Sequence, residues 1–292
     1  GTDSSRRGGA SSAGFAKTVA IKRILPGLAK DREFIDRFIA EARVAAALVH
    51  PNIVQVFDFG ELEPGVYFLA MEYVPGVDAY TLARHAFEKG FTLGGETTAG
   101  TRQPTPSEAT GLRGVLPSSI AIHLCMETAR GLGYAHSRKP QIVHRDVSPQ
   151  NMLVSFDGDV KLADFGIAKV SGSATAASVI KGKLSYMSPE QTRGDPVDGR
   201  SDLFSLGVTL YRLLTARPLF AGETLGERLA AASSYQGISD EALALVPQEV
   251  RPVLERALRP KPKDRFADAG EMEAALAECL GTAATVTIRK TL

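Results

Sequence analysis

Residues 144–166 read HRDVSPQNMLVSFDGDVKLADFG, and this stretch decides the fold. Within it, residues 152–154 and 160–163 are short strand-like runs, and Asp157-Gly158-Asp159 between them is a typical turn sequence. The pattern therefore predicts a β-hairpin. Because a hairpin returns the chain on itself, we expect the loop before it to lie close to the residues after it.

Three polar side chains flank this predicted hairpin. Asp146 and Asn151 precede it, five residues apart, and Asp164 follows Asp146 by eighteen residues. Moving a phosphoryl group from ATP needs a carboxylate that accepts the proton of the attacking hydroxyl, and oxygen ligands that hold magnesium on the phosphates. Asp146 suits the first task, and Asn151 and Asp164 suit the second.

The order and spacing of these motifs resemble those of eukaryotic-like (Hanks-type) bacterial Ser/Thr protein kinases. Each tripeptide is weak evidence alone, but the set in this order is improbable by chance. The resemblance implies an α+β fold of two lobes, with a truncated β-rich N-lobe and a helical C-lobe. It also implies transfer of the ATP γ-phosphoryl group to Ser/Thr hydroxyls of proteins, with Mg²⁺ as cofactor.

The first 75 residues predict the order β, α, β, β. Residues 15–24 turn apolar with strand-like alternation, and residues 31–48 carry one apolar stripe at helical spacing. Two strand-like runs follow at 53–59 and 66–73, separated by a Glu-Leu-Glu-Pro-Gly turn at 61–65. This region is the predicted N-lobe.

The resemblance assigns nucleotide-binding roles within this lobe. Lys22, in Val19-Ala20-Ile21-Lys22, matches the lysine that contacts the α/β-phosphates, and Glu41 matches the glutamate that holds it in place. Met71 would border the adenine pocket, and backbone groups of Glu72 and Val74 would hydrogen-bond adenine.

The rest of the chain is mostly helical in pattern. Gly, Thr and Pro make 90–117 a predicted surface loop. We expect a flexible lead over 1–14, a kinase domain over 15–280 whose lobes divide after Val74, and a tail over 281–292. Helices are predicted over the following ranges: 118–137, 201–214, 223–233, 239–245, 248–258 and 268–280.

Three further residues match structural positions of the family. Ser188-Pro189-Glu190 resembles the element that ends the activation segment of these kinases, the stretch that follows Asp164-Phe165-Gly166, and Glu190 is expected to pair with Arg265 in the interior. Asp202 is expected to brace the backbone of the catalytic loop. Arg145 precedes the catalytic aspartate, as in kinases activated by phosphorylation, so a phosphate on Ser171, Ser173, Thr175 or Ser178 would find a partner there, with Thr175 and Ser178 preferred. The alternative is a flexible loop that is not modified.

Two positions depart from the usual pattern. Ser148 stands where such kinases carry a lysine, and Lys183 stands where they carry a threonine. We hypothesise a swap in which Lys183 reaches Asp146 from the activation segment and joins the catalytic group. The alternative is that Lys183 only contacts solvent.

No Gly-x-Gly-x-x-Gly precedes Lys22, and the chain does not begin with Met. Such a loop lets backbone N–H groups approach the phosphates closely. Either the first two strands have been lost, or the protein begins further upstream. A kinase-like scaffold with little or no activity is therefore the alternative function, and a small-molecule kinase is a weaker third possibility.

The composition of the chain restricts the classes of molecule that it could bind. Lys and Arg total 34 against 33 Asp and Glu, a net charge of +1, which argues against a chain-wide surface for nucleic acid. Two cysteines cannot form a disulfide framework or a four-ligand zinc site. No signal peptide or membrane segment is evident. We expect a cytoplasmic domain that acts on proteins, with a homodimer for trans-autophosphorylation.

Overall fold

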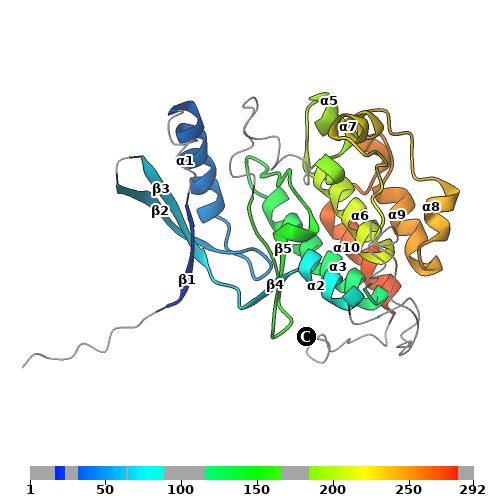
Figure 1. Cartoon of the computed structure of the whole chain (residues 1–292), viewed down its shortest axis with the longest axis horizontal. Coiled ribbons are helices and arrows are strands. Elements are labelled where there is room, and N and C mark those ends of the chain that lie inside the picture. The colour runs from blue at the N-terminus through cyan, green and yellow to red at the C-terminus, as the bar shows by residue number, and fades with distance from the viewer. Residues whose placement is uncertain (1–16, 24–31, 64, 89–115, 166–183, 282–292) are drawn as a thin grey trace, which may run out of the picture.

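The computed structural model describes residues 17–23, 32–63, 65–88, 116–165 and 184–281. A small lobe of three strands and one helix lies beside a larger, mainly helical lobe (Figure 1). The elements of the small lobe are β1 (Val19–Arg23), α1 (Arg32–Ala46), β2 (Val56–Glu63) and β3 (Val66–Glu72). Those of the large lobe are β4 (Gly76–Asp78), α2 (Ala79–Glu88), α3 (Ser118–His136), β5 (Met152–Ser155), β6 (Val160–Leu162), α5 (Pro189–Arg193), α6 (Gly199–Thr215), α7 (Leu225–Ser233), α8 (Asp240–Ala244), α9 (Arg251–Ala257) and α10 (Ala269–Leu280).

The small lobe is an antiparallel sheet of order β1-β3-β2, with α1 packed against it. Lys22 pairs with Leu69, so the two side chains share the face that α1 covers. Its core consists of buried apolar residues from the helix and the strands: Ile35, Phe38, Ala42, Ala45, Val56 and Leu69. The predicted order β, α, β, β is confirmed.

Element ends in this lobe differ from the sequence prediction. The strand expected from residue 53 begins only at Val56, because Ile53 instead forms an isolated parallel bridge with Leu162. Ile53 and Leu48 are both buried in the core of the large lobe, so the helix ends early at Ala46. At its other end, β2 continues to Glu63, beyond the start of the predicted turn.

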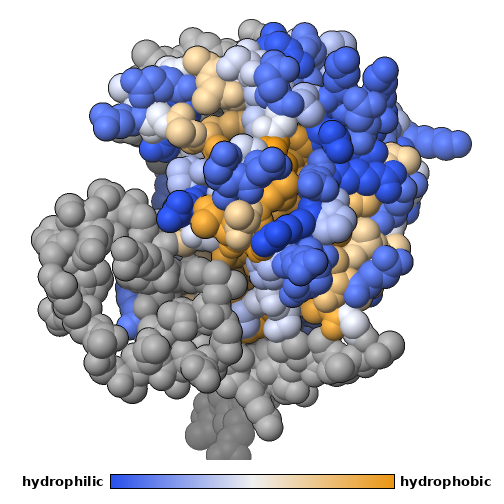
Figure 2. All heavy atoms as spheres, turned by 90° about the vertical axis from the view of Figure 1, so that its right-hand side faces the viewer, coloured by the Kyte–Doolittle hydropathy of each residue, from blue (hydrophilic) through white to orange (hydrophobic). Residues whose placement is uncertain are grey.

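The large lobe is built around α6, whose residues are almost all buried, and α3, which packs against both α6 and α10. The predicted helices are confirmed, although the one expected over 248–258 consists of a 3₁₀ turn, Gln248–Val250, followed by α9. On the face at the right of Figure 1, hydrophilic residues surround a band of hydrophobic ones (Figure 2). Among the described residues, none of the helices combines the length and apolar character that a membrane crossing requires.

Three features of the large lobe were not predicted. The helix α2 directly follows β4, and α5 is a five-residue helix with a Ser188 N-cap. Leu116, which falls in the stretch expected to be a surface loop, is 2% exposed, and its N–H donates to the Leu213 carbonyl (3.3 Å). Residues 89–115 lie outside the described residues.

The predicted hairpin is confirmed as β5 and β6, with Val154 opposite Val160. Ser155 closes the turn, since its N–H donates to the Asp159 carbonyl (2.8 Å) and its carbonyl accepts from Gly158 N–H (3.0 Å). Gly158 has φ 92°, a left-handed conformation that residues other than glycine rarely adopt.

We expect Gly158→Ala to lower the free energy of unfolding by about 1–2 kcal/mol, the cost of a left-handed non-glycine residue. The measurement is urea denaturation followed by circular dichroism. Gly226→Ala is the matched control, because Gly226 lies in α7 and an added methyl group there would meet open space. That change should stabilise the chain by up to about 1 kcal/mol. Equal effects of the two changes would contradict the role given to the turn.

Candidate active site

Asp202, which is fully buried in α6, binds the backbone of the catalytic loop, the residues around Asp146. Its Oδ2 accepts from His144 N–H and its Oδ1 from Arg145 N–H, both at 2.7 Å. Arg145 has φ 66°, so these bonds stabilise a backbone conformation that arginine rarely adopts. The predicted brace is thus confirmed. His136 also contacts Asp202, with 2.8 Å between Nε2 and Oδ2; the sequence pattern did not predict this contact.

His144 joins the catalytic loop to the residue before Asp164. Its Nδ1 accepts from Asp146 N–H (3.2 Å), so Nε2 carries the proton that it donates to the Ala163 carbonyl (2.9 Å). Burial lowers the pKa of His144 below its ordinary value, which favours this neutral form. Its ring packs edge-on against Phe165, with 4.5 Å between centroids.

Asn151 lies directly beside Asp146. Its side-chain amide donates to the Asp146 carbonyl (2.7 Å) and to Asp146 Oδ2 (3.1 Å), and its backbone carbonyl accepts from Ala163 N–H (2.8 Å). Because both amide hydrogens are directed at Asp146, the amide oxygen is the atom of this side chain suited to a metal ion. The hairpin therefore brings the loop and the Asp164 segment together, as its pattern predicted.

Lys22 reaches this site from the small lobe. Its Nζ lies 2.6 Å from Asp164 Oδ1, and the two side chains are 43% and 30% exposed. Asp164 has φ 61°, a second left-handed residue at the site. Glu41, the predicted partner of Lys22, lies in α1, but its side chain is outside what the structure describes.

The predicted adenine region lies at the end of β3. Met71 lines a small internal cavity of about 10 Å³ together with Asp164 and Phe165, and its place beside the adenine stays a prediction. The Glu72 N–H donates to the Gln55 carbonyl (2.8 Å) and is therefore already used. Adenine contacts through the Glu72 carbonyl and through Val74 stay predictions.

The interior pair expected to anchor the activation segment is present. Arg265 donates to Glu190 Oε1 (2.6 Å) and Oε2 (2.8 Å), and Ser201 Oγ donates to Oε1 (2.6 Å). Burial alone would raise the pKa of the Glu190 carboxyl, but these donors hold it below its ordinary value. This pair fixes α5 to the large lobe.

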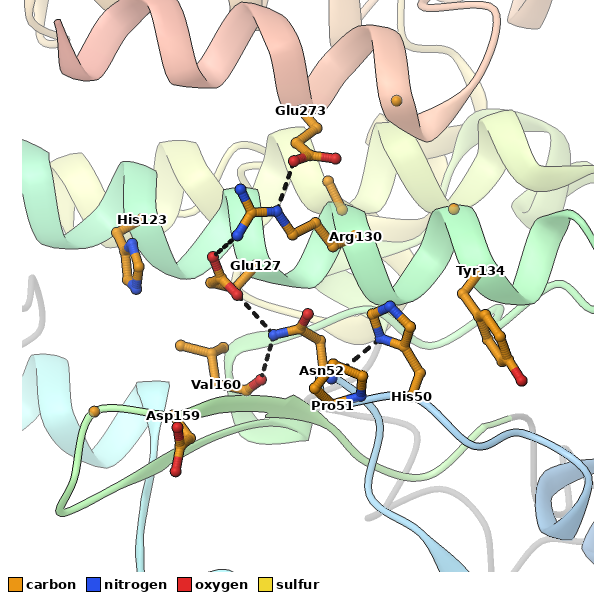
Figure 3. Close-up of a pocket in the computed structure, with 14 residues that line it drawn as sticks. His50, Pro51, Asn52, His123, Glu127, Arg130, Tyr134, Asp159, Val160 and Glu273 are labelled. Carbon is orange, nitrogen blue, oxygen red and sulfur yellow. Dashed lines mark hydrogen bonds and ion pairs between the residues drawn. The ribbon is translucent and has the colours of Figure 1, made fainter. Parts of the chain in front are cut away.

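A wider hollow, of about 790 Å³, lies elsewhere, between α3, α10 and the β5–β6 turn (Figure 3). Asn52 crosses it, donating to Glu127 Oε2 (2.8 Å) and to the Val160 carbonyl (3.0 Å). Arg130 contacts both Glu127 and Glu273, the latter at 2.6 Å. None of the predicted site residues lines this hollow. The hydrogen bonds of Asn52 connect the loop after α1 to the large lobe.

The structure brings together Lys22, Asp146, Asn151 and Asp164. Lys183 lies outside the described residues, as do the candidate phosphorylation sites Thr175 and Ser178 and the segment 1–16 before β1. Within the described part of the chain, no group of three or more His, Cys, Asp or Glu side chains could hold a metal ion. The predicted magnesium ligands combine a carboxylate with an amide oxygen, and such hard oxygen donors suit Mg²⁺.

Comparisons with known proteins identify the family of this chain. The protein kinase domain family matches residues 9–278. Similar proteins include the tyrosine-protein kinase MasK of Myxococcus xanthus (37% identical, 87% of this chain and 37% of the relative) and the serine/threonine-protein kinase PrkC of Bacillus subtilis (34%, 88% and 36%). PknB of Mycobacterium leprae, named a serine/threonine-protein kinase, is 33% identical over 89% of this chain and 38% of its own length.

The chain thus spans less than two-fifths of these relatives. Among solved structures, the PknI kinase domain of Mycobacterium tuberculosis (C20A mutant) matches with a TM-score of 0.62 and 32% identity, over 92% of this chain and 87% of that one. These findings confirm the predicted family and fold, and none of them supports the scaffold alternative. The chain belongs to the protein kinase domain family.

Proposed function

We propose that this chain transfers the γ-phosphoryl group of ATP to Ser or Thr hydroxyls of protein substrates. The observation that carries the proposal is the convergence of one ammonium, two carboxylates and one amide at the junction of the lobes. Asn151 contacts Asp146 (3.1 Å), Lys22 contacts Asp164 (2.6 Å), and Ala163 links the two pairs through its backbone.

Each side chain has a task in this proposal. Asp146 orients the attacking hydroxyl and accepts its proton, while Lys22, held in place by Glu41, binds the phosphates. Asn151 Oδ1 and the Asp164 carboxylate hold Mg²⁺, which, when bound, neutralises charge on the phosphate oxygens. Met71, Glu72 and Val74 receive the adenine. Catalysis is then positioning plus charge stabilisation.

Transfer of labelled phosphate from MgATP to casein tests the proposal, with Asp146→Asn as the background. We expect transfer by the parent chain, its loss when EDTA removes magnesium, and its loss in the variant. Equal transfer by parent and variant would overturn the assignment of Asp146, and equal transfer at background level would favour a scaffold.

Tyrosine is a second candidate acceptor, because the relative MasK is named a tyrosine-protein kinase. The two positions that usually separate the classes are both altered here, as Ser148 and Lys183. Ser148 is buried, at 3% exposure, and its carbonyl accepts from Asn151 N–H (3.0 Å). Phosphoamino-acid analysis of the labelled acceptor decides between the classes: phosphoserine or phosphothreonine supports the proposal, and phosphotyrosine alone replaces it.

The swap hypothesis gives a further prediction. If Lys183 supplies the cation that the catalytic loop lacks at Ser148, Lys183→Met should lower kcat at least about tenfold, because the charge on the phosphoryl group in transfer loses a partner. Steady-state kinetics with MgATP measure this. The matched control is Lys263→Met, since Lys263 lies in an exposed 3₁₀ turn of the large lobe. Unchanged transfer by the Lys183 variant would leave Lys183 as a solvent contact.

The wider setting is also part of the proposal. We place the domain at 15–280, with lobes dividing after Val74, an inserted loop at 90–117, a lead at 1–14 and a tail at 281–292. We further propose a cytoplasmic location, protein substrates, and a homodimer for trans-autophosphorylation of Thr175 or Ser178.

A further inference from the structure

The peptide of Arg145 is held from two sides. Asp202 binds its N–H, as described above, and Gln191 Nε2 donates to its carbonyl at 3.0 Å. Gln191 belongs to α5, which directly follows the activation segment and is separated from Arg145 by 46 residues. A left-handed arginine persists only where its surroundings determine its backbone, and Asp202 and Gln191 both contribute to that determination.

The orientation of the Gln191 amide is fixed by its other end. Its Oε1 accepts from Ser188 N–H (3.1 Å) and from Ser188 Oγ (3.2 Å), while Gln191 N–H donates back to Ser188 Oγ (3.4 Å). This is a capping box at the start of α5. Because the oxygen faces Ser188, the NH₂ group must face Arg145.

The helix α5 is itself rigidly anchored. Glu190, the neighbour of Gln191, is 2% exposed and paired with Arg265. The tether therefore runs from the buried ion pair, through Gln191, to the Arg145 carbonyl. Arg145 is the residue before Asp146, so a change in its peptide plane rotates the proposed base.

We propose that Gln191 is a positioning residue, which couples the end of the activation segment to the orientation of Asp146. The role needs an acceptor and a donor at one side-chain tip, which an amide provides and a carboxylate does not. This inference rests on the function proposed for Asp146. It also means that the catalytic loop and the activation segment adopt their productive arrangement together.

Gln191→Glu tests the coupling with an isosteric change. Glutamate also completes a capping box, so α5 keeps its cap, but a carboxylate cannot donate to the Arg145 carbonyl and repels it. We expect kcat to fall about five- to fiftyfold, KM for ATP to stay within about twofold, and the melting temperature to stay within about 2 °C of the parent, the pattern of an interaction needed only for the transition state.

Gln236→Glu is the matched control, because Gln236 makes the same type of bond, from Nε2 to the Ser234 carbonyl (3.1 Å), at an exposed site. It should keep the parental kcat. A parental kcat in Gln191→Glu overturns the inference, as does a fall that comes with a lowered melting temperature, since that marks a purely structural role.

Asp146→Asn, assayed in parallel, separates this inference from the proposed function. If that variant is inactive while Gln191→Glu has parental kcat, only the positioning role fails. If Asp146→Asn keeps parental transfer, the proposed function fails and the positioning role fails with it.

Discussion

Asp146→Asn should leave a folded chain in which transfer of phosphate to protein is about 10²–10⁴-fold slower, the usual contribution of a general base. Asparagine keeps an oxygen that can accept from the Asn151 amide, which now lies 3.1 Å from Asp146 Oδ2. The loop should therefore keep its shape, while the side chain loses its ability to take up a proton. The measurement is kcat with saturating MgATP and acceptor.

Asp159→Asn is the control for the loss of one carboxylate. Asp159 lies in the β5–β6 turn, is exposed, and accepts from Ser155 Oγ (3.3 Å). It should transfer phosphate at the parental rate. If both variants lose activity equally, the loss reports on the hairpin or on net charge, and Asp146 is not the base.

Arg265→Leu should lower the free energy of unfolding at pH 7 by about 3–5 kcal/mol, because it leaves Glu190 charged and buried without its partner. Arg265 also donates to the backbone carbonyls of Arg259 (2.7 Å) and Pro260 (2.9 Å), and these acceptors lose their bonds too. Chemical denaturation measures the change. Arg84→Met is the control, since the exposed pair of Arg84 and Glu88 is worth at most about 0.5 kcal/mol.

Acidification should reduce this difference between the parent and Arg265→Leu. In the parent, the pKa of Glu190 is below its ordinary value, so the pair stabilises the fold above the unfolded-state pKa of a glutamate, about 4.3, and this stabilisation is lost as pH falls through the lower folded pKa. In the variant, protonation instead removes a buried, unpaired charge. A gap in stability that stays constant from pH 7 to pH 4 would contradict the assigned role of the pair.

Local sequence patterns predicted the hairpin that joins the segments of Asp146, Asn151 and Asp164. Asp146, Asn151 and Asp164 come together because a tight hairpin joins their segments, and the turn at Gly158 is visible in the sequence. The contacts of Asp202 with the catalytic loop span 58 and 57 residues, and only the family resemblance indicated them. Periodicity alone gives no information on such distant pairs.

The elements and contacts that the sequence did not predict have separate physical reasons. The helix α5 is too short to show a periodic stripe, although Ser188 and Gln191 carry the capping-box signal that could have revealed it. The helix α2 could have been found from Asp78, which accepts from Thr81 N–H (2.8 Å) as an N-cap does. His136 had no local signal, because its partner Asp202 is 66 residues away.

The burial of Leu48 and Ile53 in the core of the large lobe has a mechanical consequence. The segment between them therefore packs as part of the large lobe, and this connection between the lobes lies between Ile53 and the start of β2 at Val56. Next to Val56, the Glu72 N–H donates to the Gln55 carbonyl (2.8 Å) and the Gln55 N–H donates to Glu72 Oε2 (3.2 Å). These bonds join the two segments of chain that connect the lobes. The two connections between the lobes are therefore hydrogen-bonded to each other, and we expect any hinge motion of the small lobe to bend both of them at this level.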